Sequence, residues 1–583
     1  MHRRRSSRLV SLALGLAALA AAGCDPIQDA IYAVHPPSIS LTSKPPISGG
    51  TLHVTADDRY VVMADPNLDR LTAWRTTDHE VAADVAWPRG AEPGRIADGA
   101  ASRVHVVLRG LGAIASVDIA DGSVVERSVC PEPRGLAHHA DAGTLVVACV
   151  GGDVVTLAED PSDTEPRARW FVEPDLRDAL VVDGEVFVTT FRHPALLRLD
   201  DEGRIVERAQ PTLDQGSLGD SVPTVAWRTR ALPWGRVAML HQMSLDTELR
   251  QPPSGPPVYY GSGERCGASV VQPAVTLFER KPGGDLEVIG GVRINGMGGA
   301  YDIAADGRRL VVSGAGRVEL DLATFSSTIA VCRDNNDLGA SAVAFDQYGR
   351  LYTQMYRGLY RTGPEPDDDA RVATWWPAEN TGHDLFHGPT AGALISCASC
   401  HPEGRDDGHV WRFAAGPRRT HSLLGGTAGT APYHWEGDIG SFEELMREVY
   451  SERMQGRRLA PGEIAAVEHW MTKDLRPLRI APAAAPEVLS RGRALYEDPV
   501  VGCARCHEGE GLTRSFDVNT GGSFQAPVLL GLSLRAPLMH DGCATSIRHR
   551  MVDEDCGGGD AHGKTSHLSP EALDDLVAYL ESL

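Results

Sequence analysis

The segment GTLVVACV, residues 143–150, shows the pattern that decides the fold of the first half of this chain. A glycine turn leads into a run of β-branched and apolar residues, which is typical of a short buried strand. One marker residue from each of seven such runs gives intervals of 44, 41, 41, 51, 73 and 41 residues. The other six runs are DDRYVVMA (57–64), SRVHVVL (102–108), GEVFVTT (184–190), GRVAMLH (235–241), GRRLVVS (307–313) and GRLYTQ (349–354).

The period of these runs predicts a β-propeller of about seven blades over residues 49–378. A single blade cannot bury its own faces, and closing the blades into a ring removes the exposed sheet edges. The longest interval contains an insertion rich in proline and tyrosine, residues 243–272. A pair of β-sandwiches is the alternative fold that the strand spacing leaves open. No pattern of nucleophiles, paired carboxylates or phosphate loops stands out in this half, and a propeller alone implies no chemistry.

The composition excludes several classes of protein. The chain has 583 residues, of which 23% are charged, and a mean hydropathy of −0.19. These values exclude a disordered or fibrous chain. The net charge of −22 argues against a nucleic-acid partner, because phosphate binding needs clustered lysine and arginine. The 11 cysteines are an odd number, so at least one has a role other than pairing.

The N-terminal residues predict export. Residues 2–8, HRRRSSR, are basic, and the apolar stretch 9–22 is too short to span a bilayer, which needs ~20 residues. We therefore interpret residues 1–23 as a signal peptide. Cys24 follows Ala-Ala-Gly and resembles the lipid-modified cysteine of a bacterial lipobox, although alanine stands where leucine is usual. An ordinary signal peptide that contains a cysteine is the alternative.

The lipobox resemblance implies a periplasmic or cell-envelope lipoprotein that is attached to a membrane only through the lipid on Cys24. Residues 24–48 would then form a linker from the anchor. Removal of residues 1–23 would take away four arginines and leave a net charge of −26. Such a compartment permits disulfides.

Two C-x-x-C-H motifs predict the chemistry of the second half. They are Cys397-Ala-Ser-Cys400-His401 and Cys503-Ala-Arg-Cys506-His507. In this pattern the two thiols form thioethers to a haem and the histidine binds its iron. One motif alone would also fit a redox or zinc half-site. Two motifs in an exported chain predict two covalently bound haem c groups, with His401 and His507 as proximal ligands.

The two motif segments resemble each other. Ala431 lies 30 residues after His401, and Ala536 lies 29 residues after His507. Each segment then enters an amphipathic helix, and the first of these has Ser441 as its cap. A last helix is predicted after Ser569, with proline at its first position. We therefore expect two small, mostly helical cytochrome domains, residues 379–480 and 481–583.

These residues resemble the bacterial di-haem cytochrome c peroxidase superfamily over about a third of the chain. Besides the two motifs, the resemblance is carried by Trp-Glu-Gly (435–437), Ala-Pro-Leu-Met-His-Asp-Gly (536–542) and Asp-Leu-Val-Ala-Tyr-Leu (575–580). It implies that Trp435 is the electron bridge between the two irons. It also implies a high-potential haem, usually ligated by methionine, that feeds a haem where peroxide reacts.

The resemblance suggests sixth ligands without choosing among them. Met551 is the first candidate because it lies on the helix after His-Asp-Gly, about one turn early. Met446 is its counterpart in the first segment, and Met454 and His562 are rivals. The nearby histidines that could serve the first haem are His409, His421 and His434.

Two departures from the superfamily concern catalysis and calcium. Peroxidase members carry a Glu-Met pair after the tryptophan turn, with the glutamate as acid and base. Arg453-Met454 stands here instead, and arginine cannot act as a base. Either Glu452 takes over this role, or peroxide chemistry is weak or absent. The family's bridging calcium is also doubtful, because two of its ligand positions are Thr420 and Arg535.

Six cysteines are left after Cys24 and the four motif cysteines, and six allow 15 pairings. Sequence proximity favours Cys543 with Cys556, and neighbouring blade positions favour Cys130 with Cys149. The remaining pair, Cys266 with Cys332, would join the long insertion to the following blade.

The sequence thus predicts an exported di-haem c-type cytochrome for electron transfer, an oxidoreductase of the di-haem peroxidase type. The propeller would be a docking or substrate module. One alternative is a pure electron carrier without peroxidase activity, and another is a ligand-binding propeller lipoprotein with accessory haems. The acidic charge favours a basic redox partner protein.

Overall fold

The computed structural model describes residues 43–213, 219–249, 259–261, 268–281, 285–324, 327–329, 339–375, 379–480 and 484–583. The predicted signal peptide, Cys24 and the predicted pair Cys266 and Cys332 lie outside these residues. Within the described ranges, no helix is both long and apolar enough to cross a membrane.

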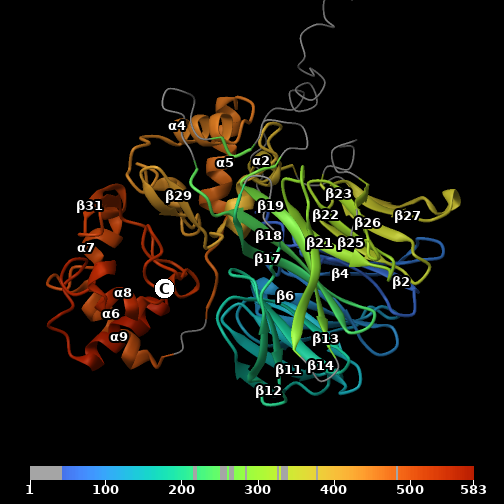
Figure 1. The fold of residues 1–583 in the computed structure, drawn as a ribbon. Helices are drawn as coiled ribbons and strands as arrows, with labels where there is room; N and C mark the ends of the chain where they lie inside the picture. The colour runs from blue at the N-terminus through green and yellow to red at the C-terminus, as the bar shows by residue number, and fades with distance from the viewer. Residues whose placement is uncertain are drawn as a thin grey trace, which may run out of the picture. The chain divides into compact units, whose positions relative to one another are not determined.

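Residues 52–374 form seven four-stranded antiparallel sheets, the blades of a β-propeller (Figure 1). The first four blades are β1 to β4 (Leu52–Val54, Tyr60–Asp65, Arg70–Arg75, Val81–Ala86), β5 to β8 (Pro93–Asp98, Arg103–Leu108, Ala113–Asp118, Val124–Ser128), β9 to β12 (Pro133–His139, Thr144–Cys149, Asp153–Ala158, Pro166–Phe171) and β13 to β16 (Leu176–Val182, Glu185–Thr190, Leu196–Leu199, Ile205–Ala209). The other three are β17 to β20 (Ser221–Leu232, Arg236–Leu245, Val271–Arg280, Leu286–Arg293), β21 to β24 (Ala300–Ala305, Arg309–Gly314, Arg317–Asp321, Ser327–Ile329) and β25 to β28 (Ala342–Phe345, Leu351–Met355, Gly358–Thr362, Ala370–Thr374). The seven-bladed propeller is confirmed, and the β-sandwich alternative is wrong.

Each of the seven sequence runs is the second strand of a blade. These strands are β2, β6, β10, β14, β18, β22 and β26. Their continuous apolar pattern follows from burial on both faces, as in β10, where five of six residues are buried. The turn before β10 places Gly143 at φ 57°, a left-handed conformation that glycine adopts without steric cost.

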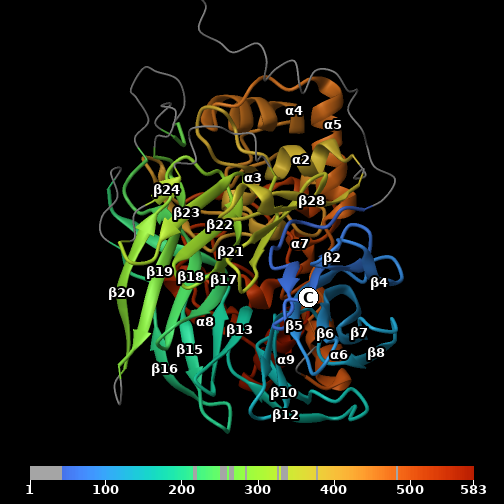
Figure 2. The ribbon, with the colours of Figure 1, turned by 90° about the vertical axis from the view of Figure 1, so that its right-hand side faces the viewer.

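The blades close into a ring through their first strands. Strand β1 lies beside β25 of the last blade as well as beside β5 of the second. Within a blade the strands follow in sequence order, as Figure 2 shows for β17 to β20. The long insertion predicted from the sequence connects β18 to β19.

The regular elements of residues 381–581 are short helices and two hairpins. The helices cover less than half of these residues, so the region is less helical than predicted. The helices are α2 (Thr381–His387), α3 (Cys397–Cys400), α4 (Phe442–Leu445) with its π-helical continuation η6 (Met446–Arg453), α5 (Pro461–His469) with η7 (Trp470–Asp474), α6 (Pro486–Glu497), α7 (Ala504–His507), α8 (Ile547–Val552) and α9 (Pro570–Glu581). The hairpins are β29 (Val410–Phe413) with β30 (Gly416–Arg419), and β31 (Ser515–Asp517) with β32 (Ser523–Gln525).

The same helix contact occurs twice in this region. From here on, the first half means residues 381–480 and the second half residues 484–583. In the first half, Gly382 of α2 lies against the backbone oxygen of Ala466 in α5. In the second half, Gly492 of α6 lies against the backbone oxygen of Asp575 in α9. A side chain at either glycine would collide with the facing helix, so glycine permits this close approach. Four residues further along all four helices, the aromatic pairs are Phe386 with Trp470 and Tyr496 with Tyr579.

The turns after each motif are also equivalent. A single β-bridge joins Tyr433 to Ile439 in the first half, and another joins Leu538 to Ala544 in the second. A serine then caps each following helix: Ser441 accepts a hydrogen bond from the Glu444 amide, and Ser546 accepts one from the His549 amide. The predicted caps Ser441 and Ser569 are both confirmed.

The two halves differ in how their apolar cores are formed. Residues of the second half, including Ile547, Met551 and Leu576, form a core of their own. The core of the first half continues into the propeller, because Leu245 and Val271 of β18 and β19 belong to the same cluster. The apolar core therefore does not break at the predicted boundary near residue 379.

Candidate functional site

The first C-x-x-C-H motif forms the short helix α3 and the turn after it. Cys397 and Cys400 are partly buried and unpaired. The Nδ1–H of His401 donates a hydrogen bond to the Arg405 carbonyl oxygen at 3.3 Å. Burial lowers the pKa of His401, which keeps its imidazole neutral near pH 7.

The second motif has the same arrangement on α7. Cys503 and Cys506 are unpaired, and the Nδ1–H of His507 donates to the Pro527 carbonyl oxygen at 2.9 Å. Burial lowers the pKa of His507 to about 4. In each half a backbone carbonyl therefore holds Nδ1 and orients the ring, which favours the tautomer with its lone pair on Nε2.

The state of the cysteines fits a covalently attached haem. The other four described cysteines are paired as Cys130–Cys149, with an S–S distance of 1.99 Å, and Cys543–Cys556. Only the four motif cysteines remain as thiols among the residues that the structure describes. Two pairs of free thiols, each followed by a buried histidine whose Nδ1 is held by a backbone carbonyl, match the donor set of haem c.

Trp435 lies where the two halves meet. Its indole N–H donates to the Arg419 carbonyl at 2.7 Å, and its own carbonyl accepts from the Gln525 amide of the second half at 2.7 Å. Its ring centroid lies 4.1 Å from that of His421 and 6.2 Å from that of His540. The predicted bridge residue thus contacts aromatic rings of both halves.

The loop after the first motif is bound to the propeller by buried ion pairs. Glu403 lies two residues after His401, and its carboxylate is 2.7 Å from Arg177 and 2.8 Å from Arg134. Arg109 is 3.9 Å away. These arginines belong to three adjacent blades. Burial alone would raise the pKa of Glu403, but the arginines hold it well below its usual value, so the carboxylate stays ionised.

The next residues of this loop extend the network. Arg405 pairs with Asp175 at 2.6 Å, and Asp406 pairs with Arg192 at 2.8 Å. The carbonyl that holds His401 therefore belongs to a residue whose side chain is fixed by the propeller.

Polar contacts also fix α3 itself. The hydroxyls of Ser396 and Ser399 donate to the Gly298 carbonyl at 3.1 and 2.9 Å. The Gln242 amide donates to the Ser399 carbonyl at 3.2 Å. Both Gly298 and Gln242 are propeller residues, so the propeller positions the first motif on two sides.

The three candidate methionine ligands are buried in apolar cores. Met446 and Met454 belong to the core of the first half, and Met551 belongs to that of the second. The sulfur of Met551 accepts a hydrogen bond from Arg550 at 3.4 Å. In contrast, the Nε2 atom of His562 lies 3.5 Å from that of His507.

The three candidate histidines near the first motif have different partners. His409 Nε2–H donates to the Leu245 carbonyl at 2.9 Å, and His434 faces Asp438 at 3.3 Å. The His421 ring packs against Trp435 at an angle of 32°, and its Nε2 is buried without a hydrogen-bond partner among the described residues. The ring of His401 also forms a hydrogen bond with the backbone of His421.

Glu452 is not brought to His401. It pairs with Arg447 at 2.9 Å, and its side chain is 38% exposed. Arg453, at the position of the peroxidase glutamate, pairs with Glu448 and also bonds to Tyr260 of the propeller insertion.

The two doubtful calcium positions have other partners. Thr420 accepts a hydrogen bond from the Trp411 indole at 3.0 Å. Arg535 is buried and donates to the Val528 carbonyl, which places a positive charge where the resemblance would require a calcium ligand. These residues do not fit a calcium site.

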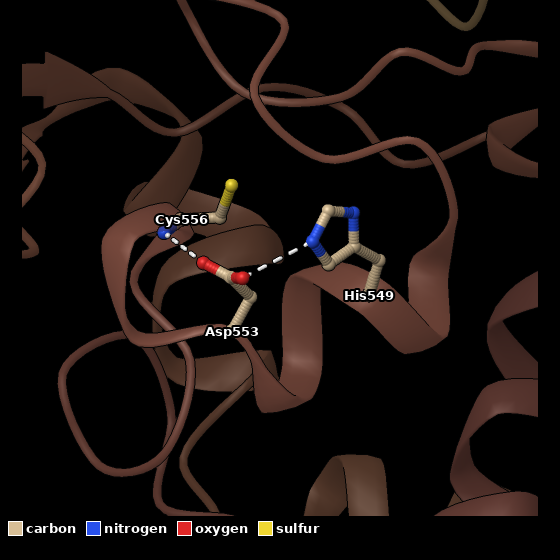
Figure 3. Close-up of side chains that lie close together, drawn as sticks. All are labelled: His549, Asp553 and Cys556. Atoms are coloured by element: carbon tan, nitrogen blue, oxygen red, sulfur yellow. Dashed lines mark hydrogen bonds and ion pairs between the residues drawn. The ribbon is translucent and has the colours of Figure 1, made fainter.

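One cluster of side chains brings three potential metal ligands within 4.8 Å of one another: His549, Asp553 and Cys556 (Figure 3). The contacts within this cluster are explained by a hydrogen bond, an ion pair and a disulfide, without a metal. Asp553 accepts from the Cys556 amide at 3.1 Å and faces His549 at 3.2 Å, and the Cys556 sulfur is bonded to Cys543.

Comparison with known proteins gives partial similarity. No protein-family model matches the chain. The hydrazine synthase subunit gamma of Kuenenia stuttgartiensis is 25% identical in an alignment of 256 residues, which covers 32% of this chain and 72% of the relative. A solved hydrazine synthase chain of the same organism has a TM-score of 0.43 and 16% identity over 54% of this chain and 95% of its own. The virginiamycin B lyase of Staphylococcus aureus has a TM-score of 0.36 and 10% identity, with 54% and 94% covered.

Sequence reasoning missed the ionic anchor of the first motif. A signal exists in three repeats of glutamate, proline and arginine at the starts of blades: Glu92-Pro-Gly-Arg95, Glu132-Pro-Arg134 and Glu173-Pro-Asp-Leu-Arg177. Combined with the charged residues Glu403 to Asp407 directly after a haem motif, this repeat points to a binding surface at the inner strands.

Proposed function

We propose that this protein is an exported di-haem c-type cytochrome that transfers electrons between two haems and acts as an oxidoreductase. The carrying observation is the duplicated unit in residues 381–581. Each copy presents two free thiols and a histidine whose Nδ1 is fixed by a backbone carbonyl. The similarity to a hydrazine synthase subunit supports a redox function.

Each copy would hold one haem c in a small cytochrome domain. Cys397, Cys400 and His401 would bind the first haem, and Cys503, Cys506 and His507 the second. The haems supply one-electron chemistry when bound. The protein keeps both histidines neutral by burial and orients them through the Arg405 and Pro527 carbonyls.

Trp435 would provide the path between the two haems. It contacts His421 on one side in a tilted arrangement and His540 on the other edge to face, so a row of aromatic rings joins the two halves. The propeller would hold the first motif rigid through Glu403, Arg405 and Asp406. Its inner strands at this face are engaged by the loop, which favours a positioning role over ligand binding there.

A peroxidase reaction has weaker support than electron transfer. The usual acid-base position is Arg453, and Glu452 faces Arg447 rather than His401. A pure electron carrier is therefore the second candidate function. The net charge of −22 favours a basic protein as the redox partner in either case.

The deciding experiment is a peroxide titration of the full chain, produced with a haem c maturation system. Absorption and electron paramagnetic resonance would be recorded in the oxidised, half-reduced and reduced states. A high-spin haem that reacts with peroxide supports the oxidoreductase. Two low-spin haems in all states, without turnover, leave the electron carrier and refute the peroxidase type.

A further inference from the structure

We infer that His562 is the sixth ligand of the haem at the second motif, so that this iron is held between two histidines. The inference rests on the proposed function and makes it more specific. Its basis is the position of two ring nitrogens: Nε2 of His507 and Nε2 of His562 face each other at 3.5 Å. The rings are 28° from parallel, with centroids 5.8 Å apart.

The hydrogen bonds of His507 give this contact its direction. Because Nδ1–H donates to the Pro527 carbonyl, Nε2 carries the lone pair, and this lone pair faces His562. A metal–imidazole bond is about 2 Å long, so two nitrogens that share a metal lie about 4 Å apart. The two imidazoles are thus already arranged as a facing ligand pair.

The surroundings of His562 leave its ring free for a metal. Its Nδ1 is buried and has no hydrogen-bond partner among the described residues. Among the described residues, the polar contact of this ring is therefore the one from Nε2 to His507.

The loop that carries His562 is fixed beside the second motif. The His562 carbonyl accepts a hydrogen bond from Arg550, and the Lys564 amide donates to the Val501 carbonyl at 3.0 Å. A Cβ atom on Gly563 would lie 3.8 Å from the Cys503 sulfur. Contacts before and after His562 therefore keep this loop at the motif cysteines.

Met551, the first candidate from the sequence, has a different environment. Its side chain packs in the core of the second half with Ile547 and Leu576, and its sulfur accepts from Arg550. Arg550 thus bonds both Met551 and the His562 carbonyl. Since methionine ligation raises a haem potential relative to histidine, this choice makes the second haem a lower-potential, six-coordinate electron carrier without an open position.

The test compares four variants of the full chain by ferric electron paramagnetic resonance, absorption and redox titration. His562→Ala removes the inferred ligand, and His562→Met replaces it with a sulfur donor. Met551→Leu keeps the core volume and removes the competing sulfur. His567→Ala changes an exposed histidine five residues away and serves as the matched control.

In His562→Ala we expect half of the haem iron to become high-spin, with low-spin signals restored by added imidazole. His562→Met should restore a low-spin haem with a sulfur-to-iron charge-transfer band and a higher potential. Met551→Leu and His567→Ala should keep the wild-type spectra. Unchanged spin state in His562→Ala, or loss of a low-spin signal in Met551→Leu, would overturn the inference.

Haem content distinguishes a failure of the proposed function from a failure of the ligand assignment. Every variant should retain two covalent haems, measured by mass, which shows that it matured and folded. A wild-type chain with fewer than two haems would refute the proposed function itself. Two haems together with an insensitive His562 variant would refute only the ligand assignment.

Discussion

Glu403, two residues after the first motif histidine, accepts a hydrogen bond at 2.7 Å from Arg177 of blade strand β13. Both side chains are almost fully buried, with exposures of 4% and 2%. This pair joins the propeller to the first candidate haem site. It gives the propeller a mechanical role, because the same loop supplies the Arg405 carbonyl that orients His401.

The first prediction concerns Glu403→Gln. Removing one partner leaves buried arginines without compensation, which typically costs about 3–5 kcal/mol. We expect a loss of this size in the free energy of unfolding, measured by denaturant titration, and an altered spectrum of one haem. Glu202→Gln, which affects an exposed pair with Arg204, is the control and should change neither. Equal behaviour of the two variants would refute the anchor.

The second prediction concerns acid stability. Asp178 lies 2.8 Å from Arg228 and 3.5 Å from Arg95 on the inner strands. Burial alone would raise the pKa of Asp178, but the arginines lower it to about 2. A lowered pKa stabilises the fold above the unfolded value of about 4, and this contribution of about 2–3 kcal/mol is lost as the pH falls towards 2.

Asp178→Asn measures that contribution directly. The difference in unfolding free energy between wild type and variant should be constant from pH 7 to about 5 and should shrink as the pH falls through 4 towards 2. A difference that grows on acidification would contradict the lowered pKa.

The predictability of this protein depends on how local each feature is. The seven strand runs can be predicted because burial on both faces leaves a continuous apolar pattern in each second strand. The caps Ser441 and Ser569 can be predicted because a cap involves residues three positions apart. Glu403 and Arg177 are 226 positions apart, and no local pattern pairs them.

The ligand candidates show the same limit. Met551 is the first candidate from the sequence because it lies on the helix after His-Asp-Gly, where the superfamily has its methionine. The position of His562 depends on the path of the loop between α8 and α9. Two hydrogen bonds fix this path, one from the Arg550 side chain to the His562 carbonyl and one from the Lys564 amide to the Val501 carbonyl. Helical periodicity contains no information on that path.

The third prediction concerns Trp435→Phe. Loss of the indole removes the hydrogen bond to the Arg419 carbonyl, worth about 1 kcal/mol. The smaller phenylalanine ring also reduces the aromatic contact between the halves. We expect severalfold slower electron transfer between the haems, measured after rapid reduction of one haem. Trp234→Phe, at a propeller position that is 78% exposed, should transfer electrons at the wild-type rate. An unchanged rate in Trp435→Phe would exclude the bridge.

The fourth prediction concerns the proximal ligands. His401→Ala and His507→Ala should each disturb the axial ligation of one haem, and therefore about half of the haem absorption, while the other half keeps its spectrum. The double variant should lose both. If either single variant has the wild-type spectrum, its histidine is not an iron ligand.

The central claim is that both C-x-x-C-H motifs carry covalent haem, and intact-mass measurement of the full chain tests it most directly. The chain would be produced with a haem c maturation system, as wild type and with the cysteines of each motif changed to alanine. We expect the added mass of two haems in wild type, one in each motif variant and none when both motifs are changed. A wild-type chain without covalent haem, or with one haem that survives the loss of either motif, would contradict it.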